Sequence, residues 1–220
     1  MLFACVGHMR AEPGQALDRP SCIVRGRDSL PWGREPIRPY VEWLRAIRHA
    51  QPMCMRFAAV NHKREVHRVA ASVVIGVTED WFGRFCDGMV ADFEMTPEDL
   101  KSPSPYVLLD TCAIDLEKEA FLGKKSPVAQ VHAICYQIAY HTRGQADIHI
   151  ATLNSHAQYE LRLRRMGFKT TGNNMHYAPL PIMRFSPKVR APTDPEYGLD
   201  AQFLNGMKLY REMNSELWGA

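Results

Sequence analysis

The feature of this sequence that most constrains its fold is a long apolar helical segment set between two segments of strand type. The helix is expected to begin at Ser126, because serine accepts hydrogen bonds from the free amides of a helix start and Pro127 suits the first turn. Its apolar residues recur at helical spacing: Val128, Val131, Ile134, Cys135 and Ile138. The flanking segments 106–115 and 146–154 are rich in apolar and β-branched residues, which is typical of strands. Since the helix must bury its stripe against such strands, the sequence predicts an α/β domain.

The remaining segments complete the predicted order of elements. An amphipathic helix is predicted at 39–50, followed by two strands at 53–60 and 67–78 that are separated by a polar turn. A second helix is predicted at 155–168 and a final extended pair at 175–185. The stretch between the second and third strands is too long for a turn, so we expect an inserted, partly ordered excursion there. The predicted strand and helix order after residue 50 is β-β-β-α-β-α-β.

The ends of the chain differ in composition from its middle. Residues 1–38 are rich in proline, glycine and arginine without helical or strand periodicity, and predict a loosely ordered N-terminal arm. Residues 39–190 form the predicted domain. Residues 191–220 predict a helical extension with one apolar side formed by Phe203, Met207, Tyr210 and Met213. This extension is expected to dock on the domain or on a second copy of the chain.

Composition argues against several classes of protein. Lysine and arginine exceed aspartate and glutamate by only 27 to 24, too little to argue for a polyanionic partner. The six cysteines form no C-x-x-C pair and the nine histidines show no compact ligand spacing, so buried reduced thiols and no metal site are expected. No apolar run reaches the roughly 18 residues of a bilayer crossing, and no signal peptide is evident. We therefore expect no membrane span and a cytoplasmic location.

The start of the central helix has the chemistry of an anion site. A helix start presents unpaired N–H groups and a partial positive charge, and Lys124 and Lys125 add two cations at the end of the preceding strand. A pyrophosphate would suit this combination. An ordinary capped helix with two solvated lysines explains the same residues equally well.

An ordered set of motifs resembles the GNAT superfamily of N-acetyltransferases over residues 40–187. The set consists of the loop 124–129, then Asn154 and Ala157, then the pair Gly167–Phe168, then closing strands. The resemblance implies a mixed, mostly antiparallel central sheet with a splayed central strand pair and flanking helices. It also implies that the pantetheine of an acyl thioester lies in the gap of that pair. The implied donor-binding residues are Cys112, Ile114, Gly123, Lys124, Lys125, Ser126, Val128, Ala129 and Asn154.

Within the superfamily, the chain looks like the branch of N-acyl amino acid synthases and acyl-homoserine-lactone synthases. This resemblance rests on the long insertion before the third strand, on the closing segment 166–185, and on Leu163 at the position where the family usually has tyrosine. The resemblance implies N-acyl transfer from acyl-CoA or an acyl carrier protein to a primary amine, which can be an amino acid. It implies these donors as co-substrates and no tightly bound cofactor.

Two residues are candidates for the chemistry. Asp110 interrupts an otherwise apolar strand segment, where a buried carboxylate is costly unless it is paired or functional. We expect it to accept the amine proton; an ion pair with an arginine explains it equally well, and Asp115 and Glu117 are exposed alternatives. Tyr159 lies one helical turn before Leu163 and is the candidate that assists the departing thiolate.

Two other readings stay open. A phage-type enzyme of the same superfamily that modifies adenine in DNA would use the arginines of the N-terminal arm and the run "RLRR" at 162–165 for phosphate contacts. The same run also suits an acidic carrier protein or a solvated helix face. A non-catalytic relative of the fold would bind a ligand or partner without transferring an acyl group.

Overall fold

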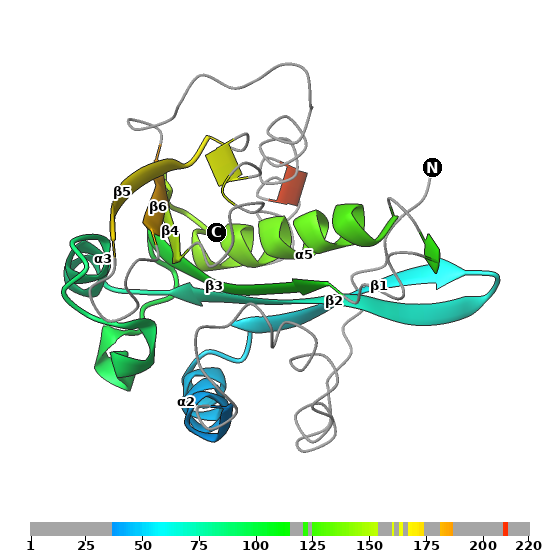
Figure 1. Cartoon of the computed structure of the whole chain (residues 1–220), viewed down its shortest axis with the longest axis horizontal. Coiled ribbons are helices and arrows are strands. Elements are labelled where there is room, and N and C mark those ends of the chain that lie inside the picture. The colour runs from blue at the N-terminus through cyan, green and yellow to red at the C-terminus, as the bar shows by residue number, and fades with distance from the viewer. Residues whose placement is uncertain are drawn as a thin grey trace.

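The computed structural model describes residues 37–114, 121–122, 125–153, 160, 163–164, 167–173, 181–186 and 209–210, with the backbone alone described at 37–40, 111–114, 125–128 and 173. These residues form a mixed α/β fold in three layers (Figure 1). A sheet lies in the middle, with α5 along one face and α2 on the other. The predicted α/β class is therefore confirmed.

The sheet has six strands in the order β1-β2-β3-β4-β6-β5. Every neighbouring pair is antiparallel except β3 and β4, which are parallel. The strand bounds are Met55–His62 for β1, Glu65–Gly76 for β2, Tyr106–Ile114 for β3, His149–Leu153 for β4, Lys169–Asn173 for β5 and Pro181–Phe185 for β6. The described helices are Ile37–Ala50 for α2, Glu79–Cys86 for α3 and Lys125–His141 for α5, with 3₁₀ turns at Asp92–Glu94 and Pro97–Asp99.

Several predicted boundaries move by one to a few residues. The first hairpin is longer than expected, because the turn consists of Lys63 and Arg64 alone, both with positive φ, 51° and 68°. Polar residues that suggested a wider turn, such as Asn61 and Glu65, pair as strand residues. In the final pair the first strand is Lys169–Asn173 rather than part of the segment 175–185. Helix α2 begins two residues before the predicted start, at Ile37.

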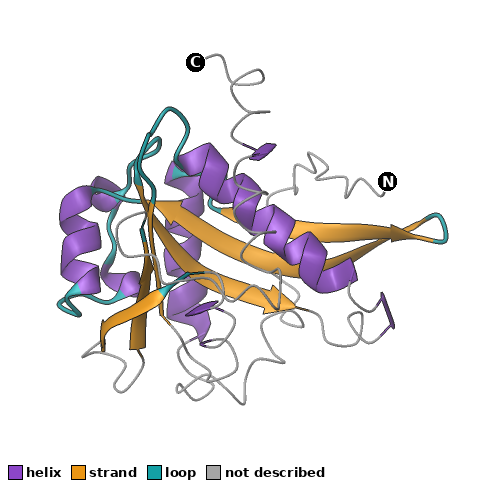
Figure 2. Cartoon of the chain, turned by 90° about the horizontal axis from the view of Figure 1, so that it is seen from above, coloured by secondary structure: helices purple, strands orange, loops and turns teal. Residues whose placement is uncertain are grey.

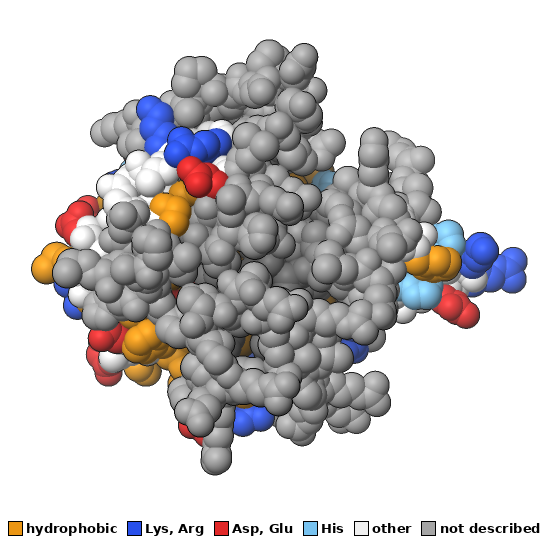
Figure 3. Space-filling model, viewed as in Figure 1, with side chains coloured by type: hydrophobic (Ala, Val, Ile, Leu, Met, Phe, Trp, Pro, Cys, Tyr) orange, Lys and Arg blue, Asp and Glu red, His pale blue; other side chains and the backbone are white. Residues whose placement is uncertain are grey.

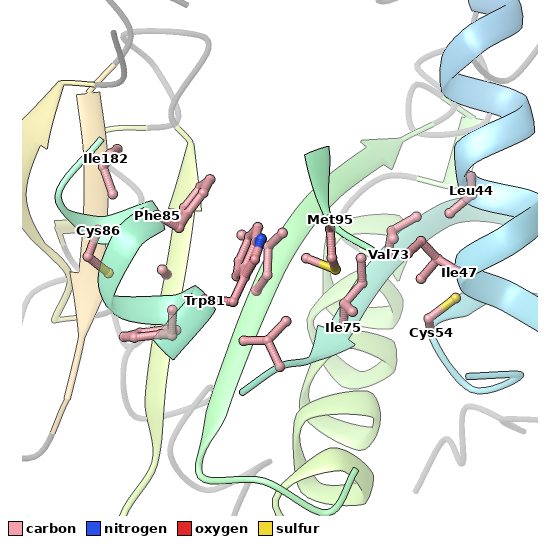
Figure 4. Close-up of a cluster of buried hydrophobic side chains, with 14 residues drawn as sticks. Leu44, Ile47, Cys54, Val73, Ile75, Trp81, Phe85, Cys86, Met95 and Ile182 are labelled. Carbon is pink, nitrogen blue, oxygen red and sulfur yellow. The ribbon is translucent and has the colours of Figure 1, made fainter. Parts of the chain in front are cut away.

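The stretch between β2 and β3 was wrongly expected to be only partly ordered. The Oγ1 of Thr78 accepts a hydrogen bond from the amide of Trp81 and caps α3. The rings of Trp81 and Phe85 stack at 5.0 Å between centroids, and both side chains are buried in the core cluster that Figure 4 draws. Gly88, at φ 73°, follows the end of this regular helix.

Buried side chains fill both faces of the sheet. The α2 face carries one cluster: Leu44, Ile47, Cys54, Val73, Ile75, Val77, Trp81, Phe82, Phe85, Cys86, Met95, Leu108, Ala151 and Ile182 (Figure 4). The α5 face carries another: Val74, Val107, Leu109, Ile134, Cys135, Ile138, Ile148, Ile150, Phe168, Met183 and Phe185. The predicted helix stripe therefore packs on the sheet at Ile134, Cys135 and Ile138, as expected.

One buried amide joins α5 to the strands beneath it. The side chain of Gln137 is fully buried, and its Nε2 donates to the carbonyl of Cys54 at 2.8 Å and of Met53 at 3.2 Å. Its Oε1 accepts a hydrogen bond from the hydroxyl of Ser72. Since a buried polar group without partners is costly, this contact fixes the position of α5 over β1 and β2.

The end of α5 is held by a second buried group. The imidazole of His141 is fully buried, with Nδ1 3.0 Å from the hydroxyl of Ser102, and the His141 carbonyl accepts from the amide of Ser104. Burial, helped by the charge of Arg143, lowers the pKa of His141 from 6.5 to about 4. His141 is therefore neutral in the folded protein at physiological pH.

Replacing Gln137 with methionine should lower the free energy of unfolding by about 1–3 kcal/mol, because two carbonyls and a hydroxyl lose their partner inside the protein. Denaturant unfolding at neutral pH measures the change. Gln130 offers a matched control on the same helix: it is also buried, but its Nε2 has no hydrogen-bond partner among the described residues. Gln130→Met should cost less than about 1 kcal/mol or stabilise the fold. Equal losses in the two variants would contradict the role given to Gln137.

His141 should make the fold sensitive to mild acid. The unfolded chain binds a proton near pH 6.5 that the folded protein takes up only near pH 4, so stability is complete above pH 6.5 and falls as the pH drops toward 4. The loss from this group should reach roughly 3 kcal/mol. Urea unfolding across this range measures it, and NMR titration of the His141 ring gives the folded pKa directly. A ring that titrates near 6.5 would contradict the prediction; His49→Gln, at an exposed site on α2, should keep the wild-type slope.

Candidate functional site

The parallel strands β3 and β4 separate soon after they meet. Their ladder consists of three residue pairs, Tyr106–His149, Val107–Ile150 and Leu108–Ala151. Strand β3 then continues to Ile114 and β4 to Leu153, without a further pair between them in the described ladder. In Figure 1, β4 and β6 rise away from the plane of β1, β2 and β3. The carboxyl-terminal halves of the two strands therefore lie apart.

A β-bulge at Asp110 lies where the strands separate. On β2, Val73 pairs with Thr111 and the next residue, Val74, pairs with Leu109, so Asp110 is the extra residue of β3. A bulge bends its strand and increases its twist, and such bulges often accompany functional sites. Because the bulge follows the last β3–β4 pair by only two residues, it provides a physical cause for the divergence of β3 from β4.

The start of α5 lies at the carboxyl end of β3. Ala129, in the second turn of the helix, is buried in a small cluster with residues from β1, β2, the segment before α5 and α5 itself: Ala58, Val60, Val69, Ala70, Leu122 and Ala133. Ala70 pairs with Ile114, the last residue of β3. At the other end of the helix, His141 contacts Ser104, two residues before β3 begins. The helix therefore runs antiparallel to β3, with its start beside the gap.

The predicted donor-binding residues fall into three groups. The backbones of Cys112 and Ile114 lie on β3 beyond the bulge, opposite Ser72 and Ala70 of β2. Three more, Lys125, Ser126 and Val128, belong to the first turns of α5. Gly123, Lys124 and Asn154 lie outside the described residues. The structure thus brings the described donor candidates to one end of the sheet.

Two details of the prediction change at the helix start. The helix begins at Lys125, so Ser126 is its second residue and not its cap. Ala129 is buried with a relative exposure of 5%, so its side chain belongs to the core. Any contact of Ala129 with a donor would have to come from its backbone.

Asp110 is half-buried, not buried as the sequence suggested. Burial raises the pKa of the Cys54 thiol to about 12, the charge of Arg48 opposes this, and the charge of Asp110 adds to it. Asp110 therefore lies within electrostatic range of Cys54, in the cluster on the α2 face. Tyr159, the other catalytic candidate, lies outside the described residues. Leu163, which follows it, is helical and packs against the cluster on the α5 face.

The three cysteines whose side chains are described are unsuited to nucleophilic chemistry. Cys54, Cys86 and Cys135 are free and buried. Burial raises the pKa of Cys86 to about 11 and that of Cys135 to about 12, as it does for Cys54. Since the thiolate is the nucleophile, these thiols are inert at neutral pH. The expectation of reduced, buried thiols is confirmed for these three.

A polar network at the opposite end of β3 and β4 was not found from the sequence. The hydroxyl of Tyr106 donates to Glu79 Oε1 at 2.7 Å, which raises the pKa of the tyrosine, and its ring stacks on His149 at 5.1 Å. The Nη2 of Arg184 reaches His149 Nδ1 at 3.4 Å. The four residues come from α3, β3, β4 and β6, so no local pattern links them. They tie α3 to the strand ends far from the gap.

Within the described ranges, no three histidine, cysteine, aspartate or glutamate side chains lie close enough together to hold a metal ion. In the same ranges, every helix is too short or too polar to cross a bilayer. Leu209 and Tyr210 are the described residues of the predicted tail helix. Tyr210 packs its ring edge-on to Tyr136, and its hydroxyl lies 3.1 Å from His132 Nδ1 on α5. Of the two predicted docking places for the tail, Tyr210 takes the one on its own chain.

Comparison with known proteins adds no family to this geometry. The chain matches no family model, no curated protein and no solved structure.

Proposed function

We propose that the protein is an N-acyltransferase that moves an acyl group from a phosphopantetheine thioester to a primary amine. The observation that carries the proposal is the parallel pair β3–β4, whose ladder ends at Leu108–Ala151 and is followed at once by the bulge at Asp110. A GNAT-like sheet with β3 and β4 as its splayed pair is part of this proposal.

The gap between the two strands suits an extended donor arm. Pantetheine is a narrow chain with amide groups, and a chain of this kind can bind a strand through main-chain hydrogen bonds, as an added strand does. The first turn of α5 begins at the same end of the sheet, where free amide groups favour a phosphate. The geometry therefore supports an arm along the gap with its phosphate at the helix start.

The reaction needs only a held carbonyl and a proton acceptor. The amine nitrogen attacks the thioester carbonyl carbon, the carbon–sulfur bond breaks, and the products are an amide and a free thiol. The proton that the amine loses goes to a base, and the departing thiolate gains a proton. Direct attack of the amine on the thioester needs no thiol nucleophile from the protein, which agrees with the inert state of Cys54, Cys86 and Cys135. Positioning of the two reactants then supplies much of the rate.

A donor screen tests the proposed function. The purified protein would be incubated with acyl-CoA and with acyl carrier protein, each loaded with short and long acyl chains, and with a panel of amines that includes amino acids. Release of thiol measured with a chromogenic disulfide, together with the mass of a new amide, is the expected result. Thiol release that needs no amine would indicate a thioesterase, and no thiol release from any donor would contradict the proposal.

Asp110→Asn should lower turnover by at least about a hundredfold, since acid–base assistance typically contributes a hundredfold to ten-thousandfold. Asp110 at the bulge is the carboxylate that we assign as the base. The dissociation constant of the donor, measured by calorimetry, should change little. Asp147→Asn, at an exposed site just before β4, is the control and should keep wild-type turnover. Near-normal turnover of Asp110→Asn in a folded protein would rule out this base.

A further inference from the structure

The β1–β2 hairpin ends in an exposed surface of mixed character, which we call the hairpin tip. It consists of residues 62–67 and Phe121. Lys63 and Arg64 form the turn and are exposed. Figure 2 shows the hairpin extending beyond the start of α5, and Figure 3 shows described cationic, histidine and apolar side chains gathered at that edge of the molecule. The tip therefore projects from the fold.

Large apolar side chains lie among the cations of the tip. Val66 is 65% exposed and Phe121 is 60% exposed. The ring of Phe121 lies edge-on to the rings of His62 and His67, at 5.1 and 6.0 Å between centroids. Exposed apolar groups ringed by charges are typical of a protein-binding surface.

The tip is continuous with the start of α5. Phe121 rests on the hairpin, the next residue Leu122 is buried with Ala129 of α5, and Lys125 begins the helix. Along β2, the tip lies beyond Ala70, which pairs with the last residue of β3. Glu65 lies five residues from Ala70 along β2, which is about 17 Å at strand spacing. A ligand bound at the tip would therefore lie about that distance beyond the end of the gap.

We propose that the hairpin tip is the docking surface for an acidic protein that carries the acyl group on a phosphopantetheine arm. The inference rests on the proposed acyl transfer and names the donor of that same site. A carrier seated on the tip can contact Lys63 and Arg64 with its acidic surface and Val66 and Phe121 with apolar residues. Its prosthetic arm then enters the gap past the start of α5.

Two other occupants fit the tip less well. Free acyl-CoA can place its phosphates at the start of α5 but has no folded surface with which to cover both Val66 and Phe121. A nucleic acid would meet the exposed carboxylate of Glu65 between the cations and the histidines, and like charges repel. A folded acidic partner can leave Glu65 at the rim of the contact.

The turn geometry allows a test that removes both charges without disturbing the hairpin. Two adjacent residues with positive φ are best served by Asn-Gly, so Lys63→Asn with Arg64→Gly suits the backbone better than the native pair. The matched control is Lys101→Asn with Lys169→Asn. It also removes two exposed lysine charges, both remote from the tip.

Binding would be measured by fluorescence anisotropy with a holo acyl carrier protein labelled at its amino terminus, at low and at moderate salt. The turn variant should bind about tenfold more weakly than wild type, because it loses two exposed cations that can pair with carboxylates of the carrier, and its binding should depend less on salt. The control variant should bind within about twofold of wild type. Equal weakening in both variants, or no carrier binding by wild type, would overturn the docking proposal.

Two further measurements separate this proposal from its alternatives. A labelled single-stranded oligonucleotide would be tested against both proteins. If wild type binds it and the turn variant does not, while both bind the carrier equally well, the tip is a nucleic-acid surface and the proposal fails. The donor screen decides the proposed function independently, since acyl-CoA turnover does not require the tip. Turnover from acyl-CoA with tip-independent carrier binding would reject the docking surface and leave the acyl transfer standing.

Discussion

The short parallel contact between β3 and β4 determines most of this architecture. Two parallel strands need a crossover, and α5 supplies it by running back over the sheet from the carboxyl end of β3 to the strand starts. The contact then ends after three pairs, at the bulge on β3. An opened strand pair and a helix start therefore share one end of the sheet.

The rest of the fold keeps that opening in place. On one side, Gln137 bonds α5 to Ser72 and to two carbonyls next to β1, so the helix cannot slide along the hairpin without breaking buried hydrogen bonds. On the other, α3 packs Trp81 and Phe85 against strands of both halves of the sheet. The network of Tyr106, His149 and Arg184 closes the end where the strands are paired. The strands are thus held together at one end only.

The sequence was informative where one local pattern decided the structure. The stripe Ile134, Cys135 and Ile138 and the apolar run of β3 predicted the helix and strand that make the crossover. It was less informative where structure depended on distant partners. No pattern marks Asp110 as a bulge, because that depends on its register against Val73 and Val74. Similarly, Lys63 and Arg64 do not read as a two-residue turn, since neither residue favours positive φ. The length of the stretch between β2 and β3 suggested a partly ordered insertion, although Trp81, Phe82 and Phe85 give α3 an apolar side.

The parallel pairing also has a consequence for how the chain folds. The β1–β2 hairpin joins neighbours in sequence, with His62 paired to Glu65, whereas Tyr106 of β3 must find His149 of β4 after the whole crossover has formed. Closing the longer loop costs more chain entropy before any contact repays it. We expect the hairpin to form early and the β3–β4 contact late. The opened end of that pair would then be among the last parts of the sheet to take shape and the first to fluctuate in the native state.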